Sequence, residues 1–193
     1  MLLSTLFTSL HSLTDEQLML RVSGQGDDKA YSELYRRHSR RLMGFFYRQA
    51  GKDEPVASDL TQDAFMRVWS HRQSYGGTAF LPWLFTIAYN LCRNHYRHLN
   101  YEQAYAANAT IADEDSDTDL PSQTDTRLFD EALHAELSKL PPPTRLLFSL
   151  RFEEELTIPQ IAAIIGIPEG TIKSRLHTLT ITLRQKLKHY DQL

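Results

Sequence analysis

The side chains best suited to chemistry lie near the C-terminus, where basic and hydrogen-bonding residues recur at helical spacing. No Asp or Glu occurs between Thr171 and His189. Cationic groups neutralise phosphate, and Arg or Lys can also hydrogen-bond guanine edges in the major groove. The pattern therefore indicates DNA binding, with a merely solvated basic face as the alternative. The residues expected to contact DNA are Gly170, Thr171, Lys173, Ser174, Arg175, His177 and Thr178.

Two short helices around a tight turn must position this basic face. Thr157 and Gln160 have the spacing of a capping box, which would start the first helix. Gly166 follows its last turn, where a left-handed backbone costs glycine little, and Pro168 opens the second helix. The inward stripe of the second helix consists of Ile172, Leu176, Leu179 and Leu183. This arrangement predicts a helix-turn-helix, whose second helix has the width that the major groove admits.

A second polar face is predicted on a helix that begins near Pro82 and runs to about His98. Its core stripe consists of Leu84, Ile87, Ala88, Leu91 and Cys92. The opposite face contains no carboxylate and also includes Thr86 and Tyr89. Amide and guanidinium groups there could bind the phosphates and bases of a nucleic-acid strand, the alternative being a solvated face. The strand-binding residues predicted from this pattern are Asn90, Arg93, Asn94 and Arg97.

The helix predicted over 59–71 has the opposite polarity. Its apolar face comprises Leu60, Ala64, Phe65, Val68 and Trp69. Beside that face lies an acidic and amide edge formed by Asp59, Gln62 and Asp63. A protein partner with basic helices would fit this edge, and a solvated face is again the alternative.

The overall charge hides a segregation along the chain. The 193 residues have a net charge of −3 and a pI near 6.2, which by themselves disfavour a nucleic-acid partner. Residues 1–98 have a net charge of +3, residues 99–124 have −6 with no Lys or Arg, and residues 125–193 have zero. The acidic stretch also lacks a periodic apolar pattern, so it cannot bury enough surface to offset its ordering entropy. It is predicted to be a flexible linker.

Apolar residues recur at helical spacing in most of the remaining chain, and no segment alternates long enough to predict a strand. The spacing predicts a basic helix over 27–49, a break at Lys52–Pro55, and a later helix that ends at Pro141–Pro143. We therefore expect an all-α protein. Two small helical domains, residues 14–98 and 125–190, would be joined by the acidic linker over 99–124.

Catalytic and metal-binding signatures are absent from the sequence. It has no phosphate-binding glycine loop, dinucleotide fingerprint, nucleophile elbow or HExxH motif, so no enzyme activity, cofactor or small-molecule substrate is expected. His95 and His98 lack an evident third metal ligand, and the acidic run over 113–119 lacks the Gly and Glu of a calcium loop. A single cysteine, Cys92, excludes an intramolecular disulfide and fits the cytoplasm.

Three segments of the chain, taken in order, resemble a known family. Asp59–Trp69 is similar to the helix that docks on the β′ clamp of RNA polymerase, and Phe80–Asn90 to the helix that reads the promoter −10 element. The third segment resembles a −35-binding domain in Leu140–Pro141, Arg145, Phe148 and the run Ile161–Leu176. On these motifs the chain is identified as a member of the extracytoplasmic-function (ECF) class of sigma factors in the sigma-70 family.

The resemblance implies an initiation subunit that binds core RNA polymerase, through its β′ clamp and β subunit, and promoter DNA. Asp59, Gln62 and Asp63 would contact the clamp. The −10 strand would be held by the loop over 72–79 and by Asn90, Arg93, Asn94 and Arg97, and residues 170–178 would dock at the −35 element. An anti-sigma factor is implied as a further partner. The run 177–182 departs from the family, whose members often have Arg there, so fewer phosphate contacts are expected.

Two other functions stay open on the residues alone. A helix-turn-helix transcriptional regulator would bind DNA by itself without being a polymerase subunit. A pure protein-interaction module would bind neither polymerase nor DNA.

Overall fold

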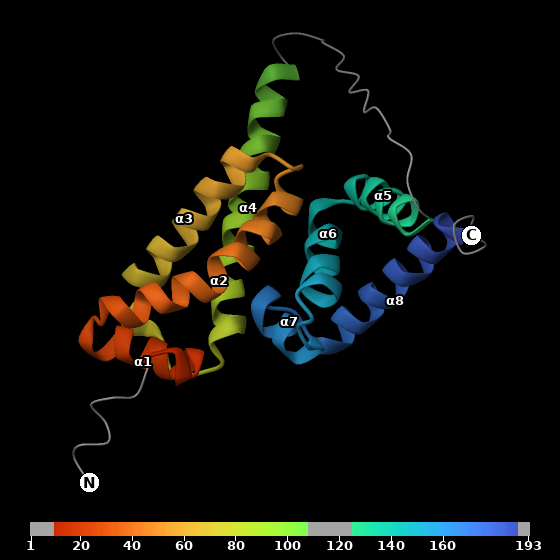
Figure 1. Cartoon of the computed structure of the whole chain (residues 1–193). Coiled ribbons are helices and arrows are strands. Elements are labelled where there is room, and N and C mark those ends of the chain that lie inside the picture. Colours follow the sequence, from red (N-terminus) through yellow and green to blue (C-terminus); the bar gives the residue numbers. More distant parts are fainter. Residues whose placement is uncertain (1–9, 108–124, 189–193) are drawn as a thin grey trace. The chain divides into compact units, whose positions relative to one another are not determined.

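The computed structural model describes residues 10–107 and 125–188, and within these ranges the chain is helical, with no strand. The described helices lie in two stretches of the chain, residues 10–107 and residues 125–188, which are called the N-terminal unit and the C-terminal unit below (Figure 1). The predicted all-α class is therefore confirmed. Residues 108–124 of the predicted linker and 189–190 of the second predicted domain lie outside the described residues, as do residues 1–9. None of the described helices is both long enough and apolar enough to cross a membrane.

The N-terminal part of the chain begins with two helices whose starts are set by local caps. Thr14 Oγ1 accepts a hydrogen bond from the Gln17 N–H at 3.2 Å, while Gln17 Oε1 accepts one from the Thr14 N–H at 2.9 Å. Asp27 Oδ1 accepts hydrogen bonds from the backbone N–H groups of Lys29 and Ala30 in the first turn of the second helix. The elements are η2 (Leu10–Ser12), α1 (Asp15–Gln25), α2 (Asp28–Gln49), α3 (Glu54–Ser70), η3 (Arg72–Ser74) and α4 (Phe80–Ala107).

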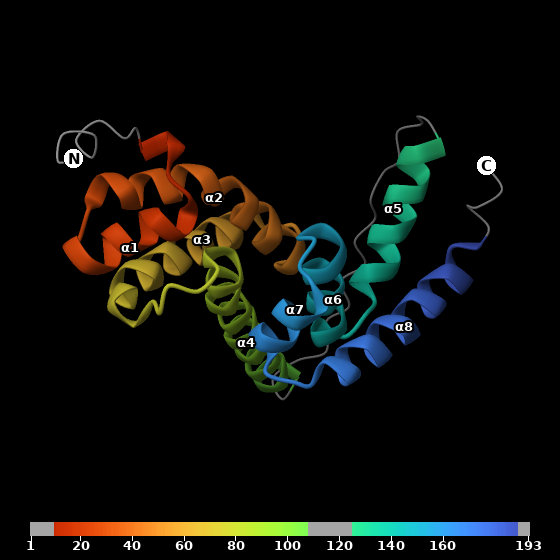
Figure 2. The same ribbon diagram turned by 90° about the horizontal axis from the view of Figure 1, so that it is seen from below.

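Aromatic side chains form much of the N-terminal core. Both α1 and α3 pack on α2 (Figure 2). The ring of Phe45 lies 5.2 Å from that of Phe85 and 5.6 Å from that of Phe46, in edge-to-face geometry that favours aromatic pairs. Burial of each such side chain contributes about 1.5–3 kcal/mol. The largest fully buried aromatic residues are Phe45, Phe46, Phe65, Phe80 and Phe85.

A polar network attaches the segment before α1 to α2. Arg37 uses all five of its N–H donors: one reaches Glu33 Oε1 and one Asp15 Oδ1, both at 2.8 Å. The other three reach backbone carbonyls of Leu10, His11 and Leu13. The carboxylate of Glu33, which is only 6% exposed, also accepts hydrogen bonds from Arg36. The start of the described chain is thus fixed on α2 by charged hydrogen bonds.

Two helix boundaries differ from the sequence prediction. α3 begins at Glu54, because Asp53 caps it by accepting from the Val56 N–H at 2.9 Å and Pro55 fits the first helical turn. α4 continues to Ala107, nine residues beyond the predicted end near His98. The sequence over 99–107 contains no Gly or Pro and includes three Ala, one Leu, one Glu and one Gln, which favour helix. The first part of the segment predicted as linker is therefore helical.

The C-terminal unit is built on aliphatic and aromatic packing. Its elements are α5 (Asp125–Ser138), α6 (Pro142–Phe148), the π-helical turn η4 (Ser149–Glu153), α7 (Ile158–Ile165) and α8 (Glu169–Lys186). A core cluster joins α5, α6 and α8 through Leu137, Phe148, Leu179, Leu183 and Leu187. The proline run that was predicted to end α5 also starts α6, since Pro141 occupies the N-cap position.

The turn between α7 and α8 has the predicted backbone. Gly166 has φ +78°, in the left-handed region, and its N–H donates to the Ala162 carbonyl at 2.9 Å. Pro168 is the N-cap residue of α8. The four residues predicted to face inward on the second helix are all buried, namely Ile172, Leu176, Leu179 and Leu183. The helix-turn-helix prediction is confirmed.

Candidate nucleic-acid interface

The first half of α8 exposes the predicted DNA-binding face. Thr171 is half-buried, whereas the other six predicted residues, Gly170, Lys173, Ser174, Arg175, His177 and Thr178, are exposed. Lys173 Nζ lies 3.9 Å from Glu169 Oε2 between two exposed side chains, a pair too loose and solvated to hold the ammonium group away from a ligand. Arg175 has no hydrogen-bond or ion-pair partner among the described residues. Its guanidinium is thus available to phosphate or guanine.

The second half of α8 makes polar contacts within the C-terminal unit. Lys186 Nζ lies 2.7 Å from Glu136 Oε2 on α5, and Lys139 donates to the other oxygen of the same carboxylate at 2.8 Å. These two hydrogen bonds lower the pKa of Glu136. Thr180 and Thr182 donate their hydroxyl protons to carbonyls four residues earlier in α8. Lys186 is therefore partly neutralised by Glu136, whereas Arg184 on the same half of α8 is exposed.

The polar face of α4 is present in the structure, with one correction. Asn90, Arg93, Asn94 and Arg97 are all exposed, and Arg97 Nη2 donates to Asn94 Oδ1 at 3.1 Å. Tyr89, which was expected on this face, is instead buried at 9% exposure. It follows the buried Phe85 by one helical turn, so the packed surface of α4 is wider than the predicted stripe.

The loop that precedes α4 is bounded by an aromatic cluster. The ring of Trp83 lies 5.2 Å from that of Tyr75 and 6.1 Å from that of Phe80. The Tyr75 hydroxyl donates to the carbonyl of Thr78, and Gly77 adopts φ +73°. The predicted −10 loop over 72–79 thus begins with η3 and closes on buried rings, while residues 76–79 are exposed.

The backbone start of α4 has a partner that the sequence analysis missed. Glu16 Oε1 on α1 accepts a hydrogen bond from the Phe80 N–H at 3.0 Å. This bond lowers the pKa of the Glu16 carboxyl group. The two residues lie 64 positions apart, and no periodicity or local motif connects them.

The acidic edge of α3 is exposed as predicted. Asp59, Gln62 and Asp63 all face solvent. Met66, one turn further along the same face, is 67% exposed, although it is a large apolar side chain. The exposed thioether of Met66 thus extends the acidic and amide edge with one apolar side chain. The sequence analysis did not include Met66, although its position seven residues after Asp59 places it on the same helix face as Asp59, Gln62 and Asp63.

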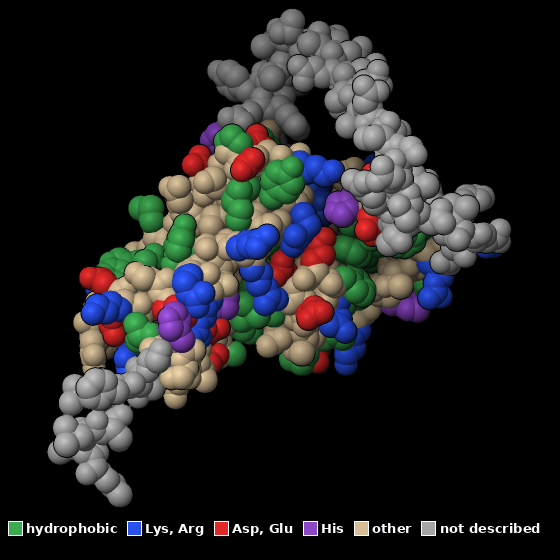
Figure 3. All heavy atoms as spheres, viewed as in Figure 1, with side chains coloured by type: hydrophobic (Ala, Val, Ile, Leu, Met, Phe, Trp, Pro, Cys, Tyr) green, Lys and Arg blue, Asp and Glu red, His purple; other side chains and the backbone are tan. Residues whose placement is uncertain are grey.

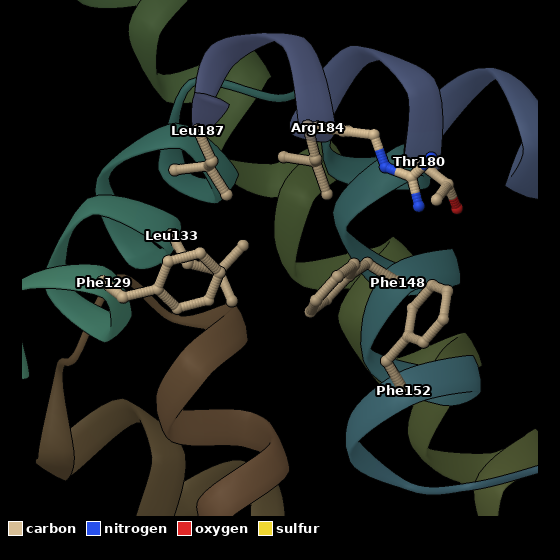
Figure 4. A pocket seen from close by; sticks show the side chains of 8 residues that line it. Phe129, Leu133, Phe148, Phe152, Thr180, Arg184 and Leu187 are labelled. Carbon is tan, nitrogen blue, oxygen red and sulfur yellow. The ribbon is translucent and has the colours of Figure 1, made fainter. Parts of the chain in front are cut away.

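The C-terminal unit also contains an apolar pocket of about 310 Å³ (Figure 4). Phe148 and Phe152 lie at one side of it with ring centroids 5.0 Å apart. Phe152 is 48% exposed. The lining residues are Phe129, Leu133, Phe148, Phe152, Thr180, Leu183, Arg184 and Leu187.

Neither a metal site nor the overall charge identifies the interface. Within residues 10–107 and 125–188, no three His, Cys, Asp or Glu side chains are placed to hold a metal ion. Charged side chains of both signs are spread over the visible surface (Figure 3). The candidate interface is instead identified by single helix faces, on α4 and α8, that contain no acidic side chain.

Two family models match the chain. Sigma-70 region 2 matches residues 34–100, and Sigma-70, region 4 matches residues 130–178. The first match contains the acidic edge of α3 and the polar face of α4, and the second contains most of the basic face of α8.

The chain matches two curated sigma factors over nearly their full lengths. The chain is 34% identical over 163 residues to RNA polymerase sigma factor CarQ of Myxococcus xanthus, covering 84% of this chain and 91% of that protein. It is 31% identical over 174 residues to ECF RNA polymerase sigma factor SigL of Mycobacterium tuberculosis, covering 88% and 97%.

Two solved structures share the fold. The first, CnrH in complex with the cytosolic domain of CnrY, has a TM-score of 0.67 at 22% identity and covers 91% of this chain and 97% of that one. The second is the sigma factor RpoE in complex with the anti-sigma factor NepR from Bartonella quintana. It has a TM-score of 0.65 at 24% identity and covers 83% and 98%.

Proposed function

Because the chain belongs to the ECF class of sigma factors in the sigma-70 family, we propose that it binds core RNA polymerase and directs it to specific promoters. The observation that supports this most strongly is the order of the two matched regions, each with an exposed face of the required chemistry. A region 2 with an anionic edge and a carboxylate-free face precedes a region 4 with a basic recognition helix.

Each face is assigned one contact in this proposal. Asp59, Gln62 and Asp63, extended by Met66, bind the β′ clamp. Phosphates and bases of the non-template −10 strand contact the loop over 72–79 and the face formed by Asn90, Arg93, Asn94 and Arg97. The N-terminal half of α8 enters the major groove at the −35 element, with Gly170, Thr171, Lys173, Ser174, Arg175, His177 and Thr178 facing DNA.

Further partners follow from the same assignment. The apolar pocket beside Phe152 is a candidate contact with the β subunit, since an exposed aromatic side chain next to a pocket suits an apolar segment of a protein. The two structural relatives were solved as complexes, RpoE with the anti-sigma factor NepR and CnrH with the cytosolic domain of CnrY. We infer that this chain too is held by an anti-sigma factor and acts in the cytoplasm, without chemistry of its own.

Run-off transcription with purified core polymerase tests the central proposal. The template is a promoter identified by mapping transcript 5′ ends after overexpression of the chain. We expect specific initiation only when core polymerase and this protein are both present. Tight DNA binding by the protein alone, with no initiation, would instead support the regulator. Binding to neither polymerase nor DNA would support the interaction module.

The clamp contact is tested by the double variant Gln62→Ala with Asp63→Ala. We expect about a ten-fold loss of affinity for core polymerase, because two exposed contacts are removed from the centre of the face. Glu54→Gln is the matched control, since it neutralises an exposed acid at the start of the same helix. Unchanged core affinity of the double variant, with a native circular dichroism spectrum, would remove the clamp assignment.

The −35 contact is tested by Arg175→Ala. A lost phosphate or guanine contact costs about 1–3 kcal/mol, so initiation should fall about ten-fold at promoters that depend on the −35 element. Lys139→Ala removes an exposed cation of the same unit that pairs with Glu136 and serves as control. An equal loss at promoters without a −35 element would show that Arg175 acts structurally.

A further inference from the structure

α1 contacts the predicted −10 loop although it lies outside the region-2 match over residues 34–100. Glu16 accepts the hydrogen bond from the Phe80 N–H, and η3 also packs on α1. Leu20, one helical turn after Glu16, is 52% exposed, and its Cδ2 would lie 3.9 Å from a Cβ added at Gly77. One face of α1 thus supports both the loop and the first residue of α4.

The start of α4 needs an external cap because its own sequence provides none. Ala79, which precedes the first helical residue, has no side-chain acceptor, and Pro82 has no N–H. The Trp83 N–H reaches the Ala79 carbonyl only at 3.4 Å. Glu16 supplies both an acceptor for the Phe80 N–H and a negative charge at the positive end of the helix dipole. The same hydrogen bond lowers the pKa of the Glu16 carboxyl group.

The other end of the exposed loop is fixed by Tyr75. This residue is 5% exposed, and its hydroxyl donates to the Thr78 carbonyl. Burial, followed by the charges of Glu16 and Asp15, raises the pKa of Tyr75 to about 12, so the hydroxyl keeps its proton. Residues 76–79 are therefore held between the Tyr75 hydroxyl and the Glu16 carboxylate.

We propose that Glu16 is a positioning residue for −10 recognition: its carboxylate sets the first turn of α4 and, with Leu20, the shape of the loop over 76–79. The inference rests on the proposed function, since it takes this loop and α4 as the −10 reader. Glu16 itself contacts no DNA. It acts through the backbone of Phe80, so its loss alters how accurately the −10 sequence is read.

The test compares reconstituted holoenzymes on the mapped promoter and on single-base −10 and −35 variants of it. For Glu16→Ala we expect the discrimination ratio at −10 to fall by up to about five-fold, the factor that corresponds to the free energy of a helix cap, with the −35 ratio unchanged. Partial unfolding of the variant would lower initiation on the mapped promoter and on its base variants by the same factor, so the ratio of the two rates would not change. The ratios therefore separate a positioning role from general destabilisation.

Three further variants keep the test decisive. Glu16→Gln keeps an acceptor oxygen and should retain part of the discrimination, whereas Leu20→Ala, at an exposed position, should give a smaller loss of the same kind. Asp28→Asn removes an exposed acid from the first turn of α2 and is the matched control. Wild-type discrimination in both Glu16→Ala and Leu20→Ala would overturn the inference. If the wild-type holoenzyme did not initiate at all, the proposed function would fail instead.

Discussion

The two units hold their proposed DNA-contacting elements in different ways. In the N-terminal unit, charged hydrogen bonds and aromatic rings connect segments far apart in sequence, as with Arg37 to η2 and Glu16 to α4. In the C-terminal unit, α8 is held mainly by an aliphatic stripe against α5 and α6. The difference matches the proposed tasks. The loop over 76–79 and the start of α4 must be fixed by several contacts if they are to bind one DNA strand. A helix that enters the major groove, such as α8, is already rigid and needs only to be held in place on its domain.

The largest effect is expected in the aromatic core of the N-terminal unit. Phe45→Ala should lower the free energy of unfolding by about 3–5 kcal/mol, because it leaves a cavity between Phe46 and Phe85. Urea denaturation followed by circular dichroism measures the loss. Tyr47→Ala, at an exposed position of the same helix, should change stability by less than about 0.5 kcal/mol. Equal effects of the two substitutions would show that the aromatic core does not dominate this unit.

The polar framework of the same unit should be nearly as important. Arg37→Met keeps the aliphatic stem but removes the hydrogen bonds to Glu33, to Asp15 Oδ1 and to three carbonyls of the segment over 10–13. The expected cost is about 3 kcal/mol, which is typical for breaking a mostly buried charged network. Urea denaturation again measures it. A cost below about 1 kcal/mol would show that the N-terminal unit, like the C-terminal unit, is stabilised mainly by apolar packing.

The same contrast explains what the sequence could predict. The stripe of α8, from Ile172 to Leu183, was predicted correctly because a single helical period encodes it. The left-handed turn at Gly166 was predicted because glycine alone adopts that backbone without cost. Both features are local in sequence. Exposure of the predicted faces on α3, α4 and α8 followed from the same periodicity.

Features that depend on tertiary contacts escaped prediction. The Glu16–Phe80 bond joins two helices through one carboxylate, and nothing local distinguishes Glu16 from a solvated acid. Tyr89 was placed on the polar face because its hydroxyl suits that face, but packing buries its ring.

One local feature was also predicted wrongly. The end of α4 was set too early because the acidic composition of the segment over 99–124 was weighted above the helix propensity of residues 99–107.

Acid should weaken the charged framework through Glu33. Hydrogen bonds from Arg36, then Arg37, lower the pKa of this carboxyl group far below its ordinary value of 4.5. A carboxyl group with a lowered folded-state pKa stabilises the protein above its unfolded pKa, and the stabilisation is lost as pH falls through the folded pKa. The difference in urea midpoint between wild type and Glu33→Gln should therefore be largest near pH 7 and shrink below pH 4.5. A difference that stays constant from pH 7 to pH 3 would contradict a role for the Glu33 charge.

The smallest effect is expected at the main ion pair of the C-terminal unit. Lys186 is 42% exposed, so solvent and salt screen its interaction with Glu136. Lys186→Met should lower the free energy of unfolding by at most about 1 kcal/mol, and 1 M salt should abolish the difference. Lys188→Met, an exposed cation two positions later, controls for the change in net charge. If Lys186→Met cost as much as Arg37→Met, α8 too would depend on a charged framework, and the contrast between the two units would fail.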